Sequence, residues 1–220
     1  MLPGEAIHIR ETLLARDAIS PLFNLGSSTR HFREVTQPHV ERELFAPLRA
    51  AGVAVVHGDR KAADGVDDEG DILDPAVRRA LVARGFKCLL LSNLLEHVRD
   101  RDAVAAACEE IVGPGGLILA TVPSSYPYHA DPIDTLYRPT PAELAALFKG
   151  SLPLLAEEVV GGTYREDLKS RGVRVPVELA RTFLWALVAI ARPKSFAARA
   201  HRWFWYWRPH RVAVALVSVR

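Results

Sequence analysis

Cysteine is scarce in this sequence and forms none of the patterns that bind metal. Only Cys88 and Cys108 occur among the 220 residues, and neither has a CxxC partner or a Cys/His companion. A zinc site is therefore not expected, and no metal site of any kind is predicted. Because Cys88 falls in an apolar run and Cys108 in a helical pattern, both are predicted to be reduced thiols in the core.

Long apolar runs are missing as well. Charged residues interrupt the N-terminal stretch, which therefore lacks the apolar run of a secretory signal. The cytoplasm is the predicted location. No uncharged stretch reaches the roughly 18 residues needed to span a bilayer. Repeats are absent, and a formal net charge of +2 gives no reason to predict a nucleic-acid partner. The length predicts a single domain, residues 1–220, with room for an insertion.

What is present is a strand–helix–strand pattern between residues 87 and 138. Residues 88–91 and 117–122 are apolar runs typical of buried strands. The helical pattern between them ends at a Gly-Pro-Gly-Gly stop, and its apolar face holds Val104, Ala107, Cys108 and Ile111. This spacing predicts a right-handed crossover between parallel strands. Ligands of such sheets bind beyond the carboxyl ends of the strands, so the site is expected in the two polar loops there.

The start of the chain predicts a helix, a strand and a second helix. Residues 5–17 have helical spacing, and residues 22–23 form a short apolar run. The loop that follows contains Gly26 and Ser27, which allow close approach of the backbone to a ligand and offer donors; a plain Gly-Ser turn is the alternative. Residues 38–50 predict a helix that Pro47 kinks or splits.

Two further strands are predicted to end in acidic residues. The second strand, residues 53–59, ends at Asp59, and a very short third strand is expected to end near Asp71, Ile72 and Leu73. A carboxylate after the second strand suits the two adjacent hydroxyls of a ribose, because it accepts two hydrogen bonds. A solvated loop aspartate is the alternative for Asp59, and Asp74 is predicted to cap the next helix.

The last third of the chain predicts two strands separated by a helical insertion. Residues 152–160 and 210–220 read as strands, and residues 164–208 are too many for a hairpin loop. Within the insertion, residues 176–191 are apolar nearly all round. A basic amphipathic helix follows, and its predicted apolar face holds Phe196, Ala200, Trp203, Phe204 and Trp207. Residues 176–208 are predicted to contact a membrane interface, to close a homodimer, or to roof a substrate cleft.

Three motifs carry a family resemblance. SNLLEHV at 92–98, PGGLILATVP at 114–123 and YHADPIDTLYRPTPAEL at 128–144 resemble the second half of class I S-adenosylmethionine (SAM)-dependent methyltransferases. They are most similar to the branch associated with sugars and cell-surface glycans. The resemblance covers about residues 22–148, and extends to residue 220 if the last strands are counted. It implies an α/β fold: a doubly wound, mostly parallel, seven-stranded Rossmann-like sheet with an antiparallel last strand and a helical insertion before it.

The resemblance also implies a cofactor site. With SAM as cofactor, Asp59 would hold the ribose, Asp71 would accept from the adenine amino group, and Ile72 would pack on its ring. The remaining predicted cofactor contacts are Gly26, Ser27 and Asn93. The glycine-rich loop departs from the family pattern, because Gly26 is its only glycine and Asn24 stands where an acid is usual.

The loop after the fifth strand is predicted to hold the methyl acceptor. An acceptor hydroxyl needs a general base, and His129 is the predicted catalytic residue because an unperturbed histidine titrates near neutrality. The predicted substrate-binding residues are Tyr128, Asp131, Asp134, Tyr137 and Arg138. A structural clasp built on an internal Arg–Asp pair is the alternative for this loop, and His97 is expected to be structural.

The predicted function is methyl transfer to a small-molecule, saccharide or lipid-linked glycan acceptor. The alternative is a catalytically inactive methyltransferase-like protein that acts as a membrane- or partner-binding module, located at the inner face of the membrane. A nicotinamide dehydrogenase is a third interpretation, and the absence of GxGxxG after the first strand speaks against it.

Overall fold

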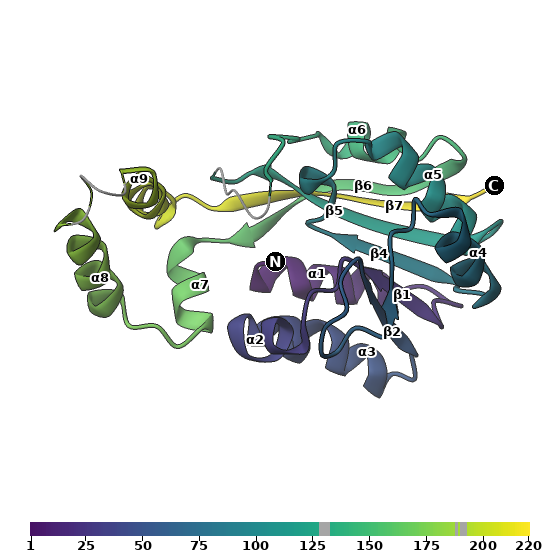
Figure 1. Cartoon of the computed structure of the whole chain (residues 1–220), viewed down its shortest axis with the longest axis horizontal. Helices are drawn as coiled ribbons and strands as arrows, with labels where there is room; N and C mark the ends of the chain where they lie inside the picture. The colour runs from purple at the N-terminus through teal and green to yellow at the C-terminus, as the bar shows by residue number, and fades with distance from the viewer. Residues whose placement is uncertain (128–132, 188, 190–192) are drawn as a thin grey trace.

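The structure is a computed structural model that describes residues 1–127, 133–187, 189 and 193–220 (Figure 1). Its seven strands are β1 (Leu22–Leu25), β2 (Val55–Asp59), β3 (Asp68–Glu69), β4 (Cys88–Ser92), β5 (Leu117–Ser125), β6 (Ser151–Gly162) and β7 (His210–Val219). Its α-helices are α1 (Pro3–Leu14), α2 (Pro38–Val40), α3 (Ala46–Ala50), α4 (Pro75–Ala83), α5 (Arg101–Val112), α6 (Pro141–Ala146), α7 (Tyr164–Ser170), α8 (Val175–Leu187) and α9 (Pro193–His201).

All seven strands form one sheet in the order β3-β2-β1-β4-β5-β7-β6. The pairs from β3 to β5 are parallel, whereas β7 runs antiparallel to both β5 and β6. This topology confirms the predicted doubly wound sheet, its antiparallel last strand and the helical insertion before that strand.

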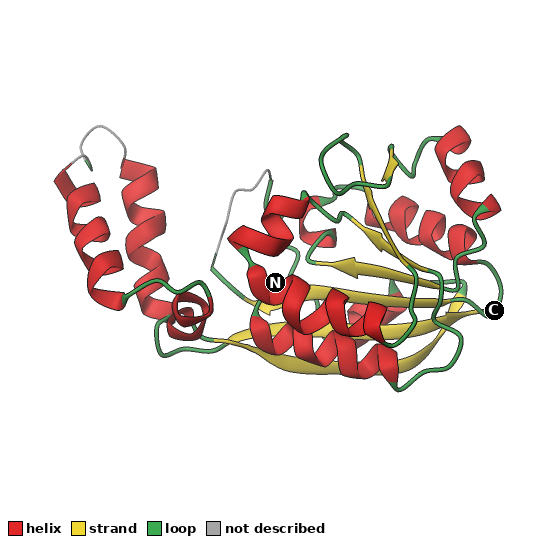
Figure 2. Cartoon of the chain, turned by 90° about the horizontal axis from the view of Figure 1, so that it is seen from below, coloured by secondary structure: helices red, strands yellow, loops and turns green. Residues whose placement is uncertain are grey.

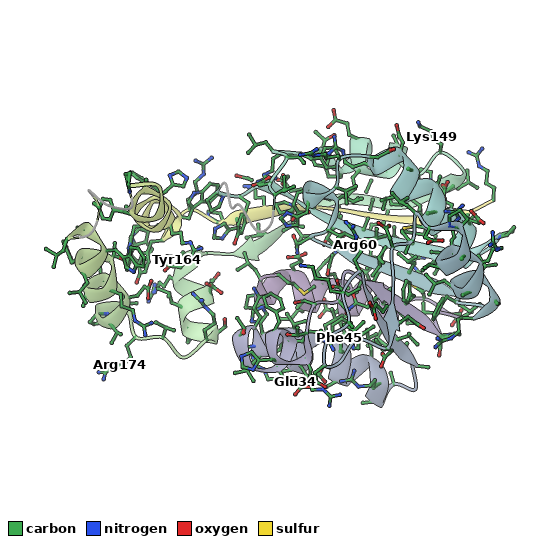
Figure 3. The ribbon with its side chains drawn as sticks, in the orientation of Figure 1. Glu34, Phe45, Arg60, Lys149, Tyr164 and Arg174 are labelled. Atoms are coloured by element: carbon green, nitrogen blue, oxygen red, sulfur yellow. The ribbon has the colours of Figure 1, made fainter. Side chains whose placement is uncertain are left out.

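Helices cover both faces of the sheet, which explains why its central strands are apolar throughout. On β4, Leu89 and Leu91 belong to the core shared with α4, α5 and α6, whereas Cys88 and Leu90 belong to the core shared with α1 and the α2–α3 region. Figure 1 shows these two groups of helices on opposite sides of the strands, and Figure 3 shows Phe45 on the α1–α3 side. Both cysteines are buried free thiols, and burial raises the pKa of Cys88 to about 12.

The predicted helix at 38–50 is continuous, and Pro47 does not split it. A π-helical segment, η2 (Glu41–Phe45), joins α2 to α3. Pro47 has no N–H to donate to the carbonyl of Glu43 four residues earlier. The guanidinium of Arg10 on α1 donates to that carbonyl instead, at 3.2 Å. The widened turn and the arginine therefore accommodate the proline within the helix.

The predicted third strand was placed too late in the chain. The strand is β3, Asp68–Glu69, and residues 71–74 form a turn in which the backbone N–H of Asp74 donates to the carbonyl of Asp71. Asp74 caps α4 as predicted, because its carboxylate accepts from the backbone N–H of Ala76 at 2.7 Å. A two-residue strand leaves no hydrophobic periodicity by which a sequence could locate it.

The insertion projects from the end of the β6–β7 pair, away from the rest of the sheet, in both views (Figures 1 and 2). It contains α7, α8, α9 and a 3₁₀ turn, η4 (Arg202–Trp205). Tyr164, Leu168 and Trp205 form a small core of its own. Within the described parts of the chain, no helix is both long enough and apolar enough to cross a bilayer.

Candidate functional site

A cavity of about 1320 Å³ lies over the carboxyl ends of β1, β2, β4 and β5. These strands are parallel, so their carboxyl ends meet at one edge of the sheet, and the neighbours β1 and β4 flank the point where the strand order reverses. The six predicted cofactor residues, Gly26, Ser27, Asp59, Asp71, Ile72 and Asn93, all line this cavity. Segments that are 67 residues apart in the chain, counted from 26 to 93, therefore meet at the place where ligands of such sheets bind.

The loop after β1 is held in place by the end of β2. The backbone N–H groups of Gly26 and Ser27 both donate to the carbonyl of Gly58, at 2.9 and 3.0 Å. Ser28 donates its backbone N–H to the Asp59 carboxylate at 2.9 Å. Gly26 has φ +74°, a conformation that glycine adopts without strain. The loop is therefore a shaped element tied to Asp59, and not a free turn.

Arg33 also holds this loop in place, and no sequence pattern points to it. It lies on the short π-helical segment η1 (Phe32–Thr36), and its buried guanidinium donates to the carbonyls of Ser27, Ser28 and Gly65 at 2.7–2.9 Å. Burial lowers the pKa of Arg33 below its ordinary value. Hydrogen bonds from a charged donor are stronger than neutral ones, so one side chain fixes the loop after β1 against the segment after β2.

Asn24 stands where the family that the sequence resembles usually carries an acid, and the structure shows what it contacts. Its side-chain nitrogen lies 3.0 Å from Nδ1 of His57 on the neighbouring strand β2. Burial, together with Arg33, lowers the pKa of His57 to about 4, so the ring is neutral at physiological pH. Nδ1 then accepts from the Asn24 amide, which places the ring proton on Nε2.

The two acids after β2 and β3 are partly exposed at the cavity wall. Asp59 accepts from Ser28 through Oδ2 and from the backbone of Lys61 through Oδ1, at 3.4 Å. Asp71 accepts from the backbone of Leu73 and forms an ion pair with Arg60, whose Nε lies 3.3 Å from Oδ2. Figure 3 shows Arg60 at this edge of the sheet. Each carboxylate oxygen has more than one lone pair, so both acids retain capacity to accept from a ligand.

Asn93 follows β4, and its side chain contacts a buried acid of α1. Its backbone has φ +52°, and its side-chain nitrogen donates to Oε1 of Glu5 at 2.7 Å. The same oxygen accepts from the hydroxyl of Thr121 at 2.7 Å, and Oε2 accepts from the backbone of Leu2 at 3.3 Å. Asn93 thus lines the cavity while its amide nitrogen holds Glu5 of α1.

Glu5 and Glu96 line the cavity as well, and both are buried, with 1% and 0% exposure. From the sequence, Glu96 is expected either beside the ammonium group of the cofactor or as a cap of the following helix, and Glu5 is not expected in the site. Burial, reinforced by the charge of Glu5, raises the pKa of Glu96 to about 7. A helical acid such as Glu5 resembles any surface glutamate in a sequence, and only its packing on Asn93 and Thr121 shows its place.

The predicted acceptor loop is described in part. Tyr128, His129 and Asp131 lie outside the described residues. The prediction that His129 is the base therefore concerns a residue that the structure does not describe. Asp134 and Arg138 form a two-pronged ion pair, with nitrogen–oxygen distances of 2.6 and 3.1 Å. This is the internal Arg–Asp clasp that the sequence left as an alternative.

Tyr137 also contacts protein groups and not the cavity. Its ring lies under the guanidinium of Arg101, 4.3 Å from ring centre to guanidinium carbon, and packs against the core that contains α5. Asp134, Tyr137 and Arg138 are not among the residues that line the cavity. His97 shares a hydrogen bond with the carbonyl of Ile133, in line with its expected structural role. Among the described residues, no group of three or more His, Cys, Asp or Glu side chains could hold a metal ion.

No protein-family model and no curated protein sequence matches the chain. Solved structures do match it. Coclaurine N-methyltransferase, bound to N-methylheliamine and SAH, is 12% identical with a TM-score of 0.56; the match covers 98% of this chain and 70% of that one. A SAM-dependent methyltransferase from Archaeoglobus fulgidus is 12% identical with a TM-score of 0.51, covering 97% and 93%. The chain has the Rossmann-like methyltransferase fold.

The same fold also serves a different reaction. The [4+2]-cyclase SpnF is 14% identical to this chain with a TM-score of 0.50, and the match covers 97% of this chain and 80% of that one. Fold similarity at such identities therefore does not determine the reaction, which has to be argued from the site. The comparisons give no support to the glycan-associated branch.

Proposed function

We propose that the chain is a SAM-dependent methyltransferase that acts on a small-molecule acceptor. The observation that carries this proposal is the meeting of Gly26, Asp59, Asp71 and Asn93 in one large cavity at the switch point of the sheet. A volume of about 1320 Å³ exceeds the roughly 300–1,000 Å³ of ordinary ligand sites, which leaves room for a nucleoside cofactor together with an acceptor.

The residues at the β1–β3 side fit an adenosyl group. Asp59 and Asp71 are partly exposed at the cavity wall. The carboxylate of Asp59 would accept from the ribose hydroxyls, and that of Asp71 from the adenine amino group. Ile72 is a buried apolar wall between that acid and the core. The fixed loop at Gly26 and Ser27 lets the backbone approach the rest of the cofactor.

SAM, when bound, supplies a methyl group that its sulfonium has already activated. The protein then has to hold the acceptor atom in line with that methyl, at about 3–3.5 Å, and keep water away from both. The β4 and β5 ends of the cavity, with Glu96 and Tyr126, are the walls that face such an acceptor. His129 remains our proposal for a base if the acceptor is a hydroxyl, and a saccharide or lipid-linked glycan acceptor is a finer proposal that rests on the sequence resemblance alone.

Binding of the demethylated cofactor tests this function directly. Calorimetry with S-adenosylhomocysteine should give a dissociation constant in the micromolar range for the full chain. Substitution of Asp59 should weaken binding, whereas a substitution at an exposed acid outside the cavity should not. No heat at millimolar ligand would contradict the proposal.

The insertion supports a separate proposal, namely that the chain contacts a membrane surface through it. Phe183, Leu184 and Leu187 on α8 are exposed, and so are Phe204 and Trp207 after α9. Exposed basic residues, among them Arg181, lie on the same insertion. Apolar side chains beside basic ones favour an interface with anionic lipid. A homodimer through residues 176–208 and a lid over the cavity are the other outcomes of the test described below.

A further inference from the structure

The cavity contains a buried acid that has no partner. Glu96 is fully buried on the 3₁₀ turn η3 (Leu95–His97), and neither of its carboxylate oxygens has a hydrogen-bond partner among the described residues. Nε2 of His97 lies 3.9 Å from Oε1, beyond hydrogen-bond distance. Glu5 is equally buried but accepts from three donors. The two acids therefore differ: the hydrogen bonds of Glu5 are made within the protein, and those of Glu96 are not.

A buried carboxylate without donors is costly, so the structure has a reason to keep one only where a ligand supplies the donors. Such a ligand has to carry hydrogen-bond donors, and a positively charged N–H group is the donor that binds a carboxylate most strongly. The second buried carboxylate, Glu5, adds to the negative potential at this wall, since its charge raises the pKa of Glu96. An anionic or purely apolar ligand would be disfavoured there.

The surrounding wall is aromatic. Tyr126, Tyr164 and Trp205 line the cavity from β5, α7 and η4. The Tyr126 ring is tilted against the ring of His210, with ring centres 4.6 Å apart, and Trp205 stacks on the same histidine at 5.0 Å. Aromatic faces attract organic cations and pack against their apolar parts. Carboxylates and aromatic rings around one cavity are the chemistry that recognises an organic ammonium group.

We propose that the methyl acceptor is a small organic amine, which enters as its ammonium form and is bound and deprotonated by Glu96. The inference rests on the proposed methyltransferase function and names its substrate class. One N–H proton passes to a carboxylate oxygen of Glu96. The freed lone pair of the nitrogen forms the new N–C bond as the C–S bond breaks, its electron pair stays on sulfur, and the positive charge moves from sulfur to the methylated nitrogen. Glu96 then returns its proton to solvent.

Glu96 is suited to both protonation states that this step requires, the charged carboxylate and the neutral acid. A pKa of about 7 allows Glu96 to be charged when the ammonium binds and to take up a proton near neutral pH. Besides burial, the charge of Glu5 on α1 raises the pKa of Glu96, whereas the amino group of Met1 and Arg138 from the loop after β5 lower it. His97, from the same turn as Glu96, lies 3.9 Å away.

The experiment compares Glu96→Gln with the wild-type chain in two assays. The first is binding of S-adenosylhomocysteine by calorimetry, which we expect to change less than twofold. The second is transfer of labelled methyl groups from SAM to ethanolamine, piperidine and 2-phenylethylamine, each beside the neutral alcohol or ether of the same shape. We expect methylation of amines only, and a loss of at least a hundredfold in kcat/KM in Glu96→Gln, together with loss of the acidic limb of its pH profile.

A matched control is Glu110→Gln, an exposed acid on α5 outside the cavity, which should leave both assays unchanged. Methylation of the alcohols instead, no transfer to any amine, or undiminished transfer in Glu96→Gln would overturn the amine proposal and leave the methyltransferase standing. A tenfold loss of S-adenosylhomocysteine affinity in Glu96→Gln would also overturn it, because the acid would then hold the ammonium of the cofactor. Failure of the wild-type chain to bind S-adenosylhomocysteine would sink the proposed function itself.

Discussion

At the scale of single residues, the site depends on carboxylates in contrasting surroundings. Asp59 is partly exposed and accepts from two backbone N–H groups, whereas Glu96 is buried and accepts from none in the described structure. An exposed acid of the first kind is suited to binding hydroxyls, and a buried acid of the second kind to moving a proton. The substitutions that test these roles therefore have different expected results.

Asp59→Asn should weaken binding of S-adenosylhomocysteine about tenfold or more. The amide keeps one oxygen acceptor for the Ser28 N–H but loses the charge, and hydrogen bonds to a charged group contribute roughly 1.5–3 kcal/mol. Calorimetric titration measures the change. Asp102→Ala, at an exposed acid of α5 that pairs with Lys149, is the control and should bind like the wild-type chain. Equal affinity of Asp59→Asn and wild type would remove Asp59 from the cofactor site.

Glu96 should also make the stability of the ligand-free protein depend on pH. Burial raises its pKa from 4.5 to about 7 in the folded state, so the folded chain binds this proton more tightly than the unfolded chain does. The stabilisation is complete below pH 4.5 and is lost as pH rises through 7, a change of roughly 3 kcal/mol. The melting temperature of Glu96→Gln relative to wild type should therefore rise between pH 4.5 and 7.5. A difference that stays constant over this range, as expected for Glu110→Gln, would contradict the assignment.

At the scale of elements, two arginines join segments that lie far apart in the sequence. Arg10 donates a hydrogen bond to the carbonyl of Glu43, which Pro47 cannot bond because it has no N–H. Arg33 links the loop after β1 to the carbonyl of Gly65. Both arginines contact backbone carbonyls, which any residue type presents. No residue pattern in the sequence therefore identifies their partners, and the contacts become visible only in the fold.

Arg33→Met should lower both stability and cofactor affinity. The substitution keeps most of the apolar stem but leaves the carbonyls of Ser27, Ser28 and Gly65 without their donor, at a cost of roughly 1–3 kcal/mol. Thermal unfolding and calorimetry with S-adenosylhomocysteine measure the two effects. The control is Arg30→Met, because Arg30 lies on the neighbouring turn but is exposed and pairs with Asp64. If both variants bind alike, Arg33 does not shape the loop.

At the scale of the whole molecule, the chain has two unequal parts. The sheet and its helices form the cavity, and the insertion projects from the β6–β7 end with a small core of its own (Figure 2). The amphipathic helix predicted for residues 194–208 is divided into α9 and η4. Trp203 packs inward, with its indole donating to Thr182 at 3.0 Å, whereas Phe204 and Trp207 are 78% and 73% exposed. The predicted single apolar face is therefore wrong at Trp203.

Flotation with liposomes that contain anionic lipid tests the insertion. The full chain should float with such vesicles, and a Phe204→Ala/Trp207→Ala variant should lose at least tenfold in bound fraction, because exposed aromatic side chains contribute the apolar contact. Leu136→Ala, at an exposed leucine outside the insertion, is the control. Sedimentation of both chains in parallel identifies a homodimer. Binding that survives the double substitution would contradict the membrane proposal.

Much of the fold follows from the sequence because its signals are local. Apolar runs located β2, β4 and β5, and the Asp74 cap located the start of α4. The π-helical turn before Pro47 and the two-residue β3 were placed wrongly or missed. These features depend on Arg10 in one case and on pairing with β2 in the other, and such contacts join residues far apart in the chain.

By itself, the sequence determined the strand–helix alternation and the polar residues at the strand ends, because hydrophobic period and turn chemistry are properties of neighbouring residues. The family resemblance, and not the periodicity, assigned Gly26, Asp59, Asp71 and Asn93 to one cofactor site. Only the tertiary structure decided that Asp134 pairs with Arg138, that Asn93 holds Glu5, and that Glu96 is buried without a donor. Whether an acid is solvated, paired or isolated depends on what folding packs around it, and that is a matter of distance in space.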